Sequence, residues 1–314
     1  MSEVVCLGIL VADVLARPVE RYPERGRLVL VDRIELHSGG CAGNTAIGLS
    51  RIGIPASVIG KVGDDGFGDF FLSAMASEGV DAGGIVRDDS ANTSSTMVLV
   101  HGDGERSFIH YIGANGTLRS EDVDLDRVAS AKVLHVAGAL LMPALDGEPT
   151  AELMAHAKSR GVTTSLDTVW DGTGRWMKAL APCLEHVDYF LPSIEEARML
   201  SGVDTPEDVA QFFLARGVGV VALKMGEAGC YVANGNEALR VPAYEVSPID
   251  ATGAGDAFAA GFLAGVVKGW NLRETARFAN AVGALCTLAI GTTAGIRGMD
   301  ETQQFMSSTP LREV

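Results

Sequence analysis

A short stretch toward the carboxyl end of the chain carries residue types suited to binding an anion. It spans residues Asp250–Asp256 and reads DATGAGD, and it continues into an apolar segment with Phe258 and Phe262 at helical spacing. Gly253 and Gly255 have no Cβ, so a ligand can approach the backbone there closely. A helix that begins here presents unpaired amides at the positive end of its dipole. The stretch therefore predicts an anion site, and a phosphoryl group in transfer is such an anion.

Asp256 lies at the mouth of these amides and is the candidate catalytic base. The alternative is structural, because a carboxylate in the first turn of a helix complements the helix dipole. A dipole-stabilised carboxylate is a weak base. In a loose transition state, however, the attacking hydroxyl loses its proton late. Phosphoryl transfer then depends more on how the carboxylate orients this hydroxyl than on its strength as a base. The amides of Gly253, Ala254 and Gly255 would stabilise the charge on the transferred oxygens.

The rest of the chain must hold this stretch in place, and it alternates apolar runs with helical segments. Residues 4–10 are apolar throughout, as in a central strand covered on both faces, and Asp13 follows where open α/β sheets bind ligands. We expect helices at 44–52, 68–78, 121–131 and 149–160, and strands at 56–61, 133–137, 162–166 and 218–223. This order predicts an α/β fold with a doubly wound, mostly parallel sheet flanked by helices.

Two β-rich segments interrupt the alternation and predict a small second sheet, a lid over the main one. We expect short strands at 28–31 and 34–36, and a hairpin of 95–101 with 106–112 whose turn covers 101–105. The expected domains are an α/β domain that binds nucleotide and substrate, made of 1–13, 38–91 and 113–314, and a discontinuous β lid, made of 14–37 and 92–112. The polar tail at 302–314 is expected to be peripheral.

Composition limits the partners of the protein. The 314 residues carry a formal net charge of −15, which argues against nucleic acid or an anionic membrane as a partner. Hydrophobic residues make up 47% of the chain, which is enough for a sizeable core. The five widely spaced cysteines have no metal-binding spacing and are expected to be reduced thiols. Because no signal peptide or membrane-spanning run is recognisable, we expect a cytoplasmic protein.

Two segments resemble the signatures of the ribokinase-like (PfkB) carbohydrate kinases. Residues 250–258 are similar to the C-terminal signature, and residues 38–53, which read SGGCAGNTAIGLSRIG, are similar to the N-terminal one. The resemblance runs from about Val4 to about Gly295. It implies a ribokinase-like fold and an ATP- and Mg²⁺-dependent sugar kinase that transfers the γ-phosphoryl group of ATP to a hydroxyl of a small sugar or sugar derivative.

The resemblance also implies which residues bind the sugar. Gly39, Gly40 and Asn44 carry over as sugar-binding residues, and Asp13 as the acceptor for two sugar hydroxyls. The structural alternative is a glycine-rich turn in which Asn44 caps the following helix. Where ribokinase has an asparagine two residues before the aspartate, this chain has Val11. One polar sugar contact is therefore missing or supplied elsewhere, which argues against ribose.

Further residues match the family's nucleotide site. Lys224, Gly226 and Gly229 resemble its nucleotide-binding glycine loop, although any hairpin at this place would also favour two glycines. Asn280 falls where the family presents a side chain to the adenine region.

The resemblance implies two cation sites. Glu196 matches a glutamate that acts on Mg²⁺ through water, but Ser193 replaces the family's asparagine, and the pair also fits a capping box. Asp250 and Thr252, with carbonyls near Cys286 and Gly291, resemble the site for a monovalent cation such as K⁺ in some members.

Motifs of several other enzyme classes are absent from the sequence. It has no P-loop, no HExxH zinc motif and no GxSxG elbow, and the 253–258 segment lacks the third glycine of a dinucleotide fingerprint. A nucleoside kinase on the same fold, a kinase of phosphorylated sugars and a non-catalytic sugar or nucleotide sensor stay open. A phosphorylated sugar would need a basic residue such as Arg33, Lys61 or Arg106, and Arg106 and His110 of the lid could reach a substrate. Exposed lid edges leave a homodimer through the lid open.

Overall fold

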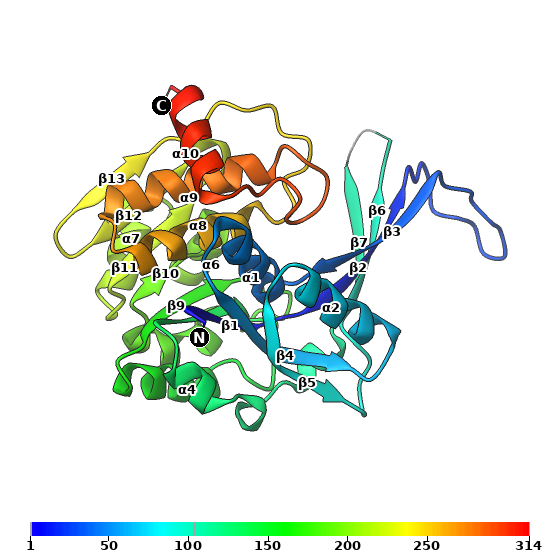
Figure 1. The fold of residues 1–314 in the computed structure, drawn as a ribbon, viewed down its shortest axis with the longest axis horizontal. Coiled ribbons are helices and arrows are strands. Elements are labelled where there is room, and N and C mark those ends of the chain that lie inside the picture. Colours follow the sequence, from blue (N-terminus) through cyan, green and yellow to red (C-terminus); the bar gives the residue numbers. More distant parts are fainter. Residues whose placement is uncertain (1, 103–104, 314) are drawn as a thin grey trace.

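The computed structural model describes residues 2–102 and 105–313, whose strands form two sheets (Figure 1). The larger sheet has nine strands in the order β13-β12-β11-β10-β9-β8-β1-β4-β5. Neighbours from β11 to β5 are parallel, whereas β12 and β13 add an antiparallel edge. The strands are β1 (Val4–Gly8), β4 (Ala56–Gly63), β5 (Asp81–Asp88), β8 (Val133–Ala139), β9 (Thr163–Thr168), β10 (Tyr189–Phe190), β11 (Val220–Lys224), β12 (Cys230–Asn234) and β13 (Ala238–Val241).

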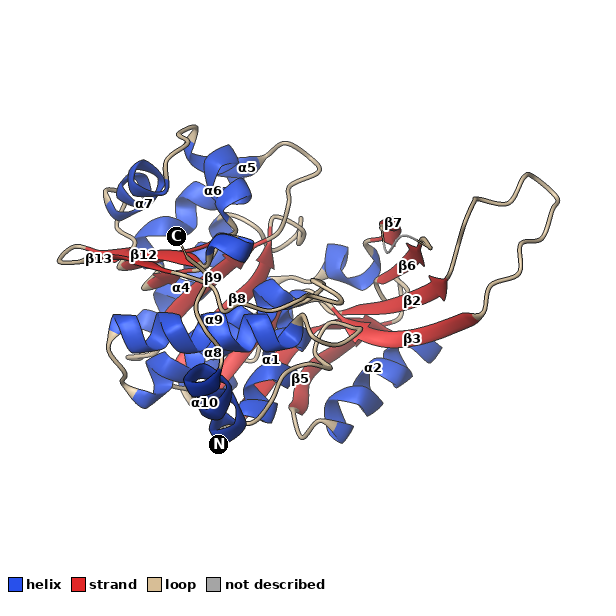
Figure 2. Ribbon diagram, turned by 90° about the horizontal axis from the view of Figure 1, so that it is seen from above, coloured by secondary structure: helices blue, strands red, loops and turns tan. Residues whose placement is uncertain are grey.

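Helices cover both faces of this sheet (Figure 2). One face packs against α3 (Leu125–Ala129), α4 (Glu148–Ser159), α5 (Trp176–Leu180), α6 (Ile194–Ser201) and α7 (Pro206–Leu214). The other packs against α1 (Cys41–Ile52), α2 (Gly66–Ser77), α8 (Ala254–Lys268), α9 (Leu272–Cys286) and α10 (Met299–Ser308).

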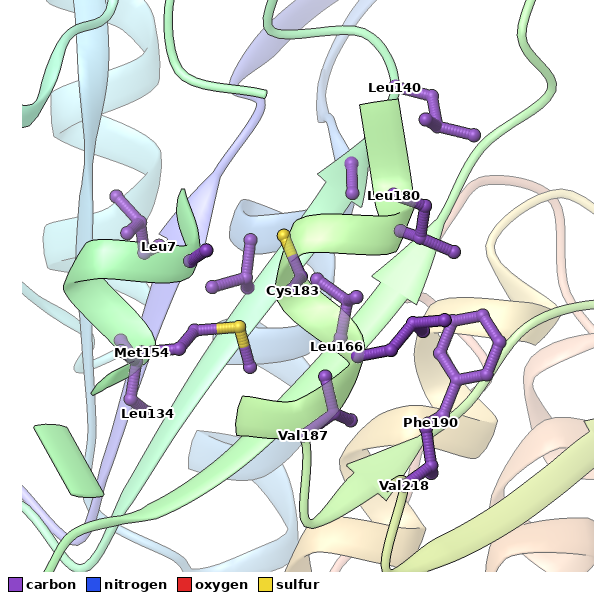
Figure 3. Packing of buried hydrophobic residues seen from close by; sticks show 14 of the residues in the cluster. Leu7, Leu134, Leu140, Met154, Leu166, Leu180, Cys183, Val187, Phe190 and Val218 are labelled. Carbon is purple, nitrogen blue, oxygen red and sulfur yellow. The ribbon is translucent and has the colours of Figure 1, made fainter. Parts of the chain in front are cut away.

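Strand β1 contributes to the cores on both faces. Val5 and Leu7 lie in the core under α4, and Val4 and Cys6 lie in the core under α1, because successive side chains of a strand point to opposite faces. Figure 3 shows part of the first core, in which Met154 of α4 packs with side chains of the strands. The continuous apolar run at 4–10 is explained by this two-sided burial. The predicted doubly wound, mostly parallel sheet is confirmed.

The smaller sheet has four strands in the order β3-β2-β6-β7 and extends away from the main body (Figure 1). Its strands are β2 (Val11–Arg17), β3 (Arg33–Gly39), β6 (Ser95–Val100) and β7 (Arg106–Tyr111). The expected hairpin of β6 and β7 is present, and the amide of His101 donates to the carbonyl of Glu105 at 2.7 Å. Residues 103 and 104 of its predicted turn lie outside the described residues.

The expected strand at 28–31 is wrong. Leu28 and Leu30 are 83% and 84% exposed and lie in the loop between β2 and β3. A hydrophobic run forms a strand only where a neighbour supplies backbone partners, and here β3 pairs with β2 instead. Asp13 was expected to follow the first strand of the main sheet directly. It lies instead within β2 of the small sheet. The division into domains stays a prediction.

The expected helix at 121–131 is shorter than predicted. A 3₁₀ turn at Ser120–Asp122 precedes the five residues of α3. The carboxylates of Asp122 and Asp124 accept the amides of Arg119 and Arg127, at 2.8 and 3.0 Å. These two caps separate the segment into two turns, because an aspartate side chain competes with the helical backbone for its amides.

The tail was expected to be peripheral, and among residues 302–313 only Thr302 is fully buried. The tail continues α10, and beyond the helix Leu311 forms a β-bridge with Tyr244. No helix among the described residues is long and apolar enough to cross a membrane.

Candidate active site

Helix α8 begins at the predicted anion-binding stretch. Gly253 is its N-cap and has φ 78°, and a Cβ there would lie 2.1 Å from the carbonyl oxygen of Thr292, so only glycine fits. The amide of Ala254 donates to the carbonyl of Ala251 at 3.2 Å, so this expected donor is already engaged. Among the described residues, the amides of Gly253 and Gly255 have no acceptor. Two of the three expected amides are thus free at the helix N-terminus.

Asp256 joins the two signature segments. Its Oδ2 accepts a hydrogen bond from Nδ2 of Asn44 at 2.8 Å. Burial raises the pKa of Asp256, although the bond from Asn44 and the charge of Lys224 lower it. Asp256 is therefore a stronger base than its place in the helix dipole predicts.

The contact between Asn44 and Asp256 depends on the crossing of α1 and α8. A Cβ on Gly48 would lie 2.8 Å from the Cβ of Ala260, so these two small residues let the helices approach closely. Asn44 lies inside α1, whose N-cap is Gly40, so it does not cap the helix. Its side chain is buried, and its Oδ1 has no partner among the described residues.

The small sheet presents a row of polar residues. Strand register pairs Asp13 of β2 with His37 of β3 and with Thr96 of β6, and Thr96 with His110 of β7. Directly paired residues point to the same face, so these side chains form one row across four strands. The hydroxyl of Thr96 lies 3.1 Å from Nδ1 of His110. We call this set the polar row.

Asp13 faces the first signature segment. Burial raises the pKa of Asp13, while the bond from Thr96 and the charge of His37 lower it and the charge of Asp256 raises it further. A Cβ on Gly39 would lie 2.0 Å from Oδ2 of Asp13. The missing side chain of Gly39 thus makes room for this carboxylate.

A buried ion pair lies beside Asp256. Nζ of Lys224, at the end of β11, donates to both carboxylate oxygens of Asp167, at the end of β9, at 2.8 and 2.6 Å. Burial raises the pKa of Asp167 to about 7, although Lys224 lowers it. The third N–H of the Lys224 ammonium remains, and the group lies 3.4 Å from where a Cβ of Gly255 would be.

Glu196 forms the capping box of α6 with Ser193. Its Oε2 accepts from the amide of Ser193 at 3.1 Å and from the hydroxyl of Thr168 at 3.0 Å, and its own amide donates to the Ser193 hydroxyl. Oε1 has no partner among the described residues. Ser193 and Glu196 therefore form the capping box that the sequence analysis gave as the structural alternative. One carboxylate oxygen of Glu196 is still free to bind a ligand.

A cavity of about 550 Å³ extends from Asp256 along the sheet. Its wall includes Glu196, Lys224, Gly226, Gly229, Gly253, Ala254, Gly255, Asp256 and Asn280. The amide of Asn280 donates to the carbonyls of Val241 and Pro242, at 3.0 and 3.1 Å, so this side chain fixes the loop after β13. Tyr244 and Arg312 also line the cavity.

Asp250, in contrast, lies outside this cavity and contacts the small sheet. Its Oδ1 is 2.5 Å from Nη1 of Arg106 on β7 and accepts the amide of Thr252 at 2.8 Å. Its Oδ2 accepts the amide of Gly291 at 2.8 Å. The resemblance had implied a cation ligand at this place.

Several residues of the site were missed at the sequence level. Asp167 follows an expected strand, so its place at the carboxyl end of a parallel strand was a usable signal. Cys41 lies within the N-terminal signature, next to the glycines that were named. Thr96 and His37 have no local signal, because only strand pairing places them beside Asp13.

Comparison with known protein families gives a match along most of the chain. The profile of the pfkB family carbohydrate kinases matches residues 1–297. The chain belongs to the pfkB family. A ribokinase from Staphylococcus aureus is 31% identical over 311 residues, which cover 96% of this chain and 99% of that protein. The 2-dehydro-3-deoxygluconokinase of Bacillus subtilis is 29% identical and covers 91% of each chain.

Solved structures agree with this assignment to the pfkB family. A putative ribokinase II from E. coli, in complex with ATP and Mg²⁺, has a TM-score of 0.85 and 27% identity, and the match covers 98% of this chain and 99% of that one. As a pfkB-family member the chain is a sugar kinase, a phosphotransferase with the ribokinase-like fold, as the sequence predicted.

Proposed function

We propose that this pfkB-family protein transfers the γ-phosphoryl group of ATP to a primary hydroxyl of a small polyhydroxylated substrate. The observation that carries the proposal is the hydrogen bond between Asn44 and Asp256, which joins the two signature segments beside free amides. One side of Asp256 faces the large cavity, and the other faces Asn44, whose unpartnered Oδ1 can accept a substrate hydroxyl.

Asp256 orients the attacking hydroxyl and accepts its proton. Its raised pKa suits this role, because a base works best when its pKa lies near the operating pH. The amides of Gly253 and Gly255, with the ammonium of Lys224, bind the oxygens of the transferred group. The pair with Asp167 holds the Lys224 ammonium in place and charged. Catalysis is then largely positioning and charge stabilisation.

The nucleotide occupies the cavity of about 550 Å³ in this proposal, with its phosphates toward Gly255 and its base toward Asn280 and Tyr244. Gly226 has nothing within 4 Å of its Cβ position, which leaves room for a phosphate beside its backbone. Mg²⁺ would neutralise charge on the phosphates, and the free oxygen of Glu196 would hold it through water. No group of three or more metal-binding side chains occurs among the described residues, which fits a metal held mainly by phosphates.

The polar row favours a sugar over a nucleoside. Asp13, Thr96 and His110 offer hydroxyl-binding groups on adjacent strands. Phe108, 60% exposed, lies on the same face of β7 as His110 and is the residue on which a nucleoside base would stack.

An assay of ADP release with a panel of sugars, sugar acids and nucleosides tests the proposal. We expect turnover with one or more sugars and none with nucleosides. Asp256→Asn should lower kcat by several orders of magnitude with substrate affinity largely kept, since it keeps the size of the side chain and removes the base. A variant that retains more than about a tenth of the wild-type kcat, a loss below ~1.4 kcal/mol, would contradict the mechanism.

We also propose that two copies associate through the outer face of the small sheet. Leu36, Met97 and Ile109 lie in register on the face opposite the polar row, and Ile34 and Tyr111 lie on the same face. All five side chains are at least 36% exposed, so the face is a continuous apolar patch. A second copy of the chain would cover it and the exposed strand edges.

A further inference from the structure

The ion pair between Arg106 and Asp250 connects the small sheet to the loop that precedes α8. The Asp250 side chain is 1% exposed and that of Arg106 is 17% exposed, so the contact is largely out of solvent. Arg106 is the first residue of β7, four positions before His110 of the polar row. Asp250 is three residues before Gly253, whose amide is one of the free donors of the anion site. The pair thus joins two elements that would enclose the substrate from opposite sides.

The carboxylate of Asp250 has three N–H donors around it. Burial acts to raise the pKa of Asp250, but hydrogen bonds from the amides of Gly291 and Thr252 and from Arg106 outweigh it and lower the pKa. Asp250 is therefore ionised, and the guanidinium of Arg106, which does not deprotonate in proteins, balances its charge.

These residues do not fit the monovalent-cation site that the resemblance implied. A cation such as K⁺ needs several unoccupied oxygens. Both Asp250 oxygens already accept N–H donors, and the carbonyls of Thr252 and Thr292 face the thiol of Cys286, at 3.8 and 3.2 Å. A metal ion and the guanidinium cannot both sit against Oδ1 of Asp250.

We propose that Arg106 is the permanent cation of this site and that the enzyme needs no monovalent metal ion. Arg106 acts as a positioning residue, because it holds Asp250 and, through the amide of Thr252, the loop whose free amides bind the transferred phosphoryl group. The charge comes from the small sheet, so the loop is held in position only while that sheet lies against it. The effect of Arg106 on kcat rests on the proposed kinase function.

Kinetics in different salts test the inference. With the best sugar from the panel, wild-type kcat should change by less than about twofold when KCl is replaced by tetramethylammonium chloride at equal ionic strength. Arg106→Gln should lose about tenfold or more in kcat in tetramethylammonium chloride, a factor that corresponds to ~1.4 kcal/mol. KCl should restore part of this loss, because the vacated Asp250 oxygen can then bind K⁺.

Two further variants control for indirect effects. Arg106→Lys keeps a positive charge near Asp250 and should stay closer to wild type than Arg106→Gln. Arg27→Gln removes an exposed arginine from the loop between β2 and β3 and should behave as wild type in both salts. Activation of the wild type by K⁺ of more than about fivefold, ~1 kcal/mol, would overturn the inference. So would an Arg106→Gln variant with wild-type kcat in both salts.

A binding readout separates this inference from the proposed function. An ion that binds only the native state raises the Tm. Exchange of tetramethylammonium for K⁺ should raise the Tm of Arg106→Gln and leave that of the wild type unchanged. If the wild type phosphorylates no sugar, the proposed function fails, yet these melting curves still decide whether Arg106 occupies a cation site. A K⁺-dependent Tm of the wild type itself would overturn the inference in either case.

Discussion

Burial gives His135 of β8 a pKa well below that of a free histidine. Its side chain is fully buried, with Nδ1 3.0 Å from the hydroxyl of Ser165 and Nε2 without a partner among the described residues. Burial, with the charge of Lys224, lowers the pKa of His135 to about 3. An unfolded histidine protonates near pH 6.5, so between these values the unfolded chain binds a proton that the folded chain does not. Stability therefore rises with pH across this window.

We expect the free energy of unfolding of the wild type to fall, relative to that of His135→Gln, by about 1.4 kcal/mol per pH unit as the pH decreases from about 6 to 4. Urea unfolding at a series of pH values, followed by tryptophan fluorescence, measures this difference. Parallel curves for the wild type and His135→Gln would contradict the lowered pKa of His135 in the folded protein.

At the scale of elements, the crossing of α1 and α8 determines how the site is assembled. Asn44 precedes Gly48 by one turn on α1, and Asp256 precedes Ala260 by one turn on α8. Any separation of the helices at the Gly48–Ala260 contact therefore lengthens the 2.8 Å hydrogen bond between Asn44 and Asp256.

Gly48→Ala should separate these helices, because its Cβ would lie 2.8 Å from that of Ala260 and 3.2 Å from Cδ1 of Ile296. We expect a loss of about 1–3 kcal/mol in stability from overpacking, partly offset by the better helix propensity of alanine. We also expect a fall of about tenfold in kcat. Gly66→Ala, at the start of α2 with nothing within 4 Å, should leave both unchanged. Denaturant unfolding and the ADP-release assay measure the two effects, and an unchanged kcat for Gly48→Ala would contradict the argument.

Local patterns of the sequence predicted both signature segments and the strands β1, β4, β8, β9 and β11, because each depends on neighbouring residues, but they did not predict β5, β12 or β13. They did not predict which distant residues meet. Asp167 and Lys224 lie on different strands, and the polar row is defined by strand register alone. The strand expected at 28–31 failed for the same reason, because a strand needs a pairing partner elsewhere in the chain, and β2 pairs with β3 and β6 instead. The pair of Arg106 and Asp250 likewise depends on how the small sheet lies against the loop before α8.

At the scale of the whole molecule, the small sheet has two chemically different faces. The polar row looks toward the site, and the apolar patch of Ile34, Leu36, Met97, Ile109 and Tyr111 is exposed on the other side. A patch of this kind on a thin sheet is stable in water mainly when another surface covers it.

We expect the wild type to be dimeric at micromolar concentrations and Ile109→Glu to be monomeric, because a charge in the apolar patch cannot be buried without a partner. Light scattering coupled to size-exclusion chromatography measures the mass. Phe108→Glu is the matched control: it adds the same charge to the adjacent residue of β7, on the opposite face, and should stay dimeric. A monomeric wild type would remove the basis for association through this face.

Arg312 lines the cavity in which we propose that nucleotide binds, and this has a practical consequence for handling the protein. Arg312 pairs with Glu227 at 2.9 Å, and its amide bonds the carbonyl of Ala243, so this part of the backbone is fixed at the cavity rim. If nucleotide binds in this cavity as proposed, an affinity tag at the carboxyl end would follow a segment that lines the cavity. The amino terminus lies elsewhere, next to β1 (Figure 1). Purification handles are therefore better placed at the amino terminus, or removed by a protease before ligand-binding measurements.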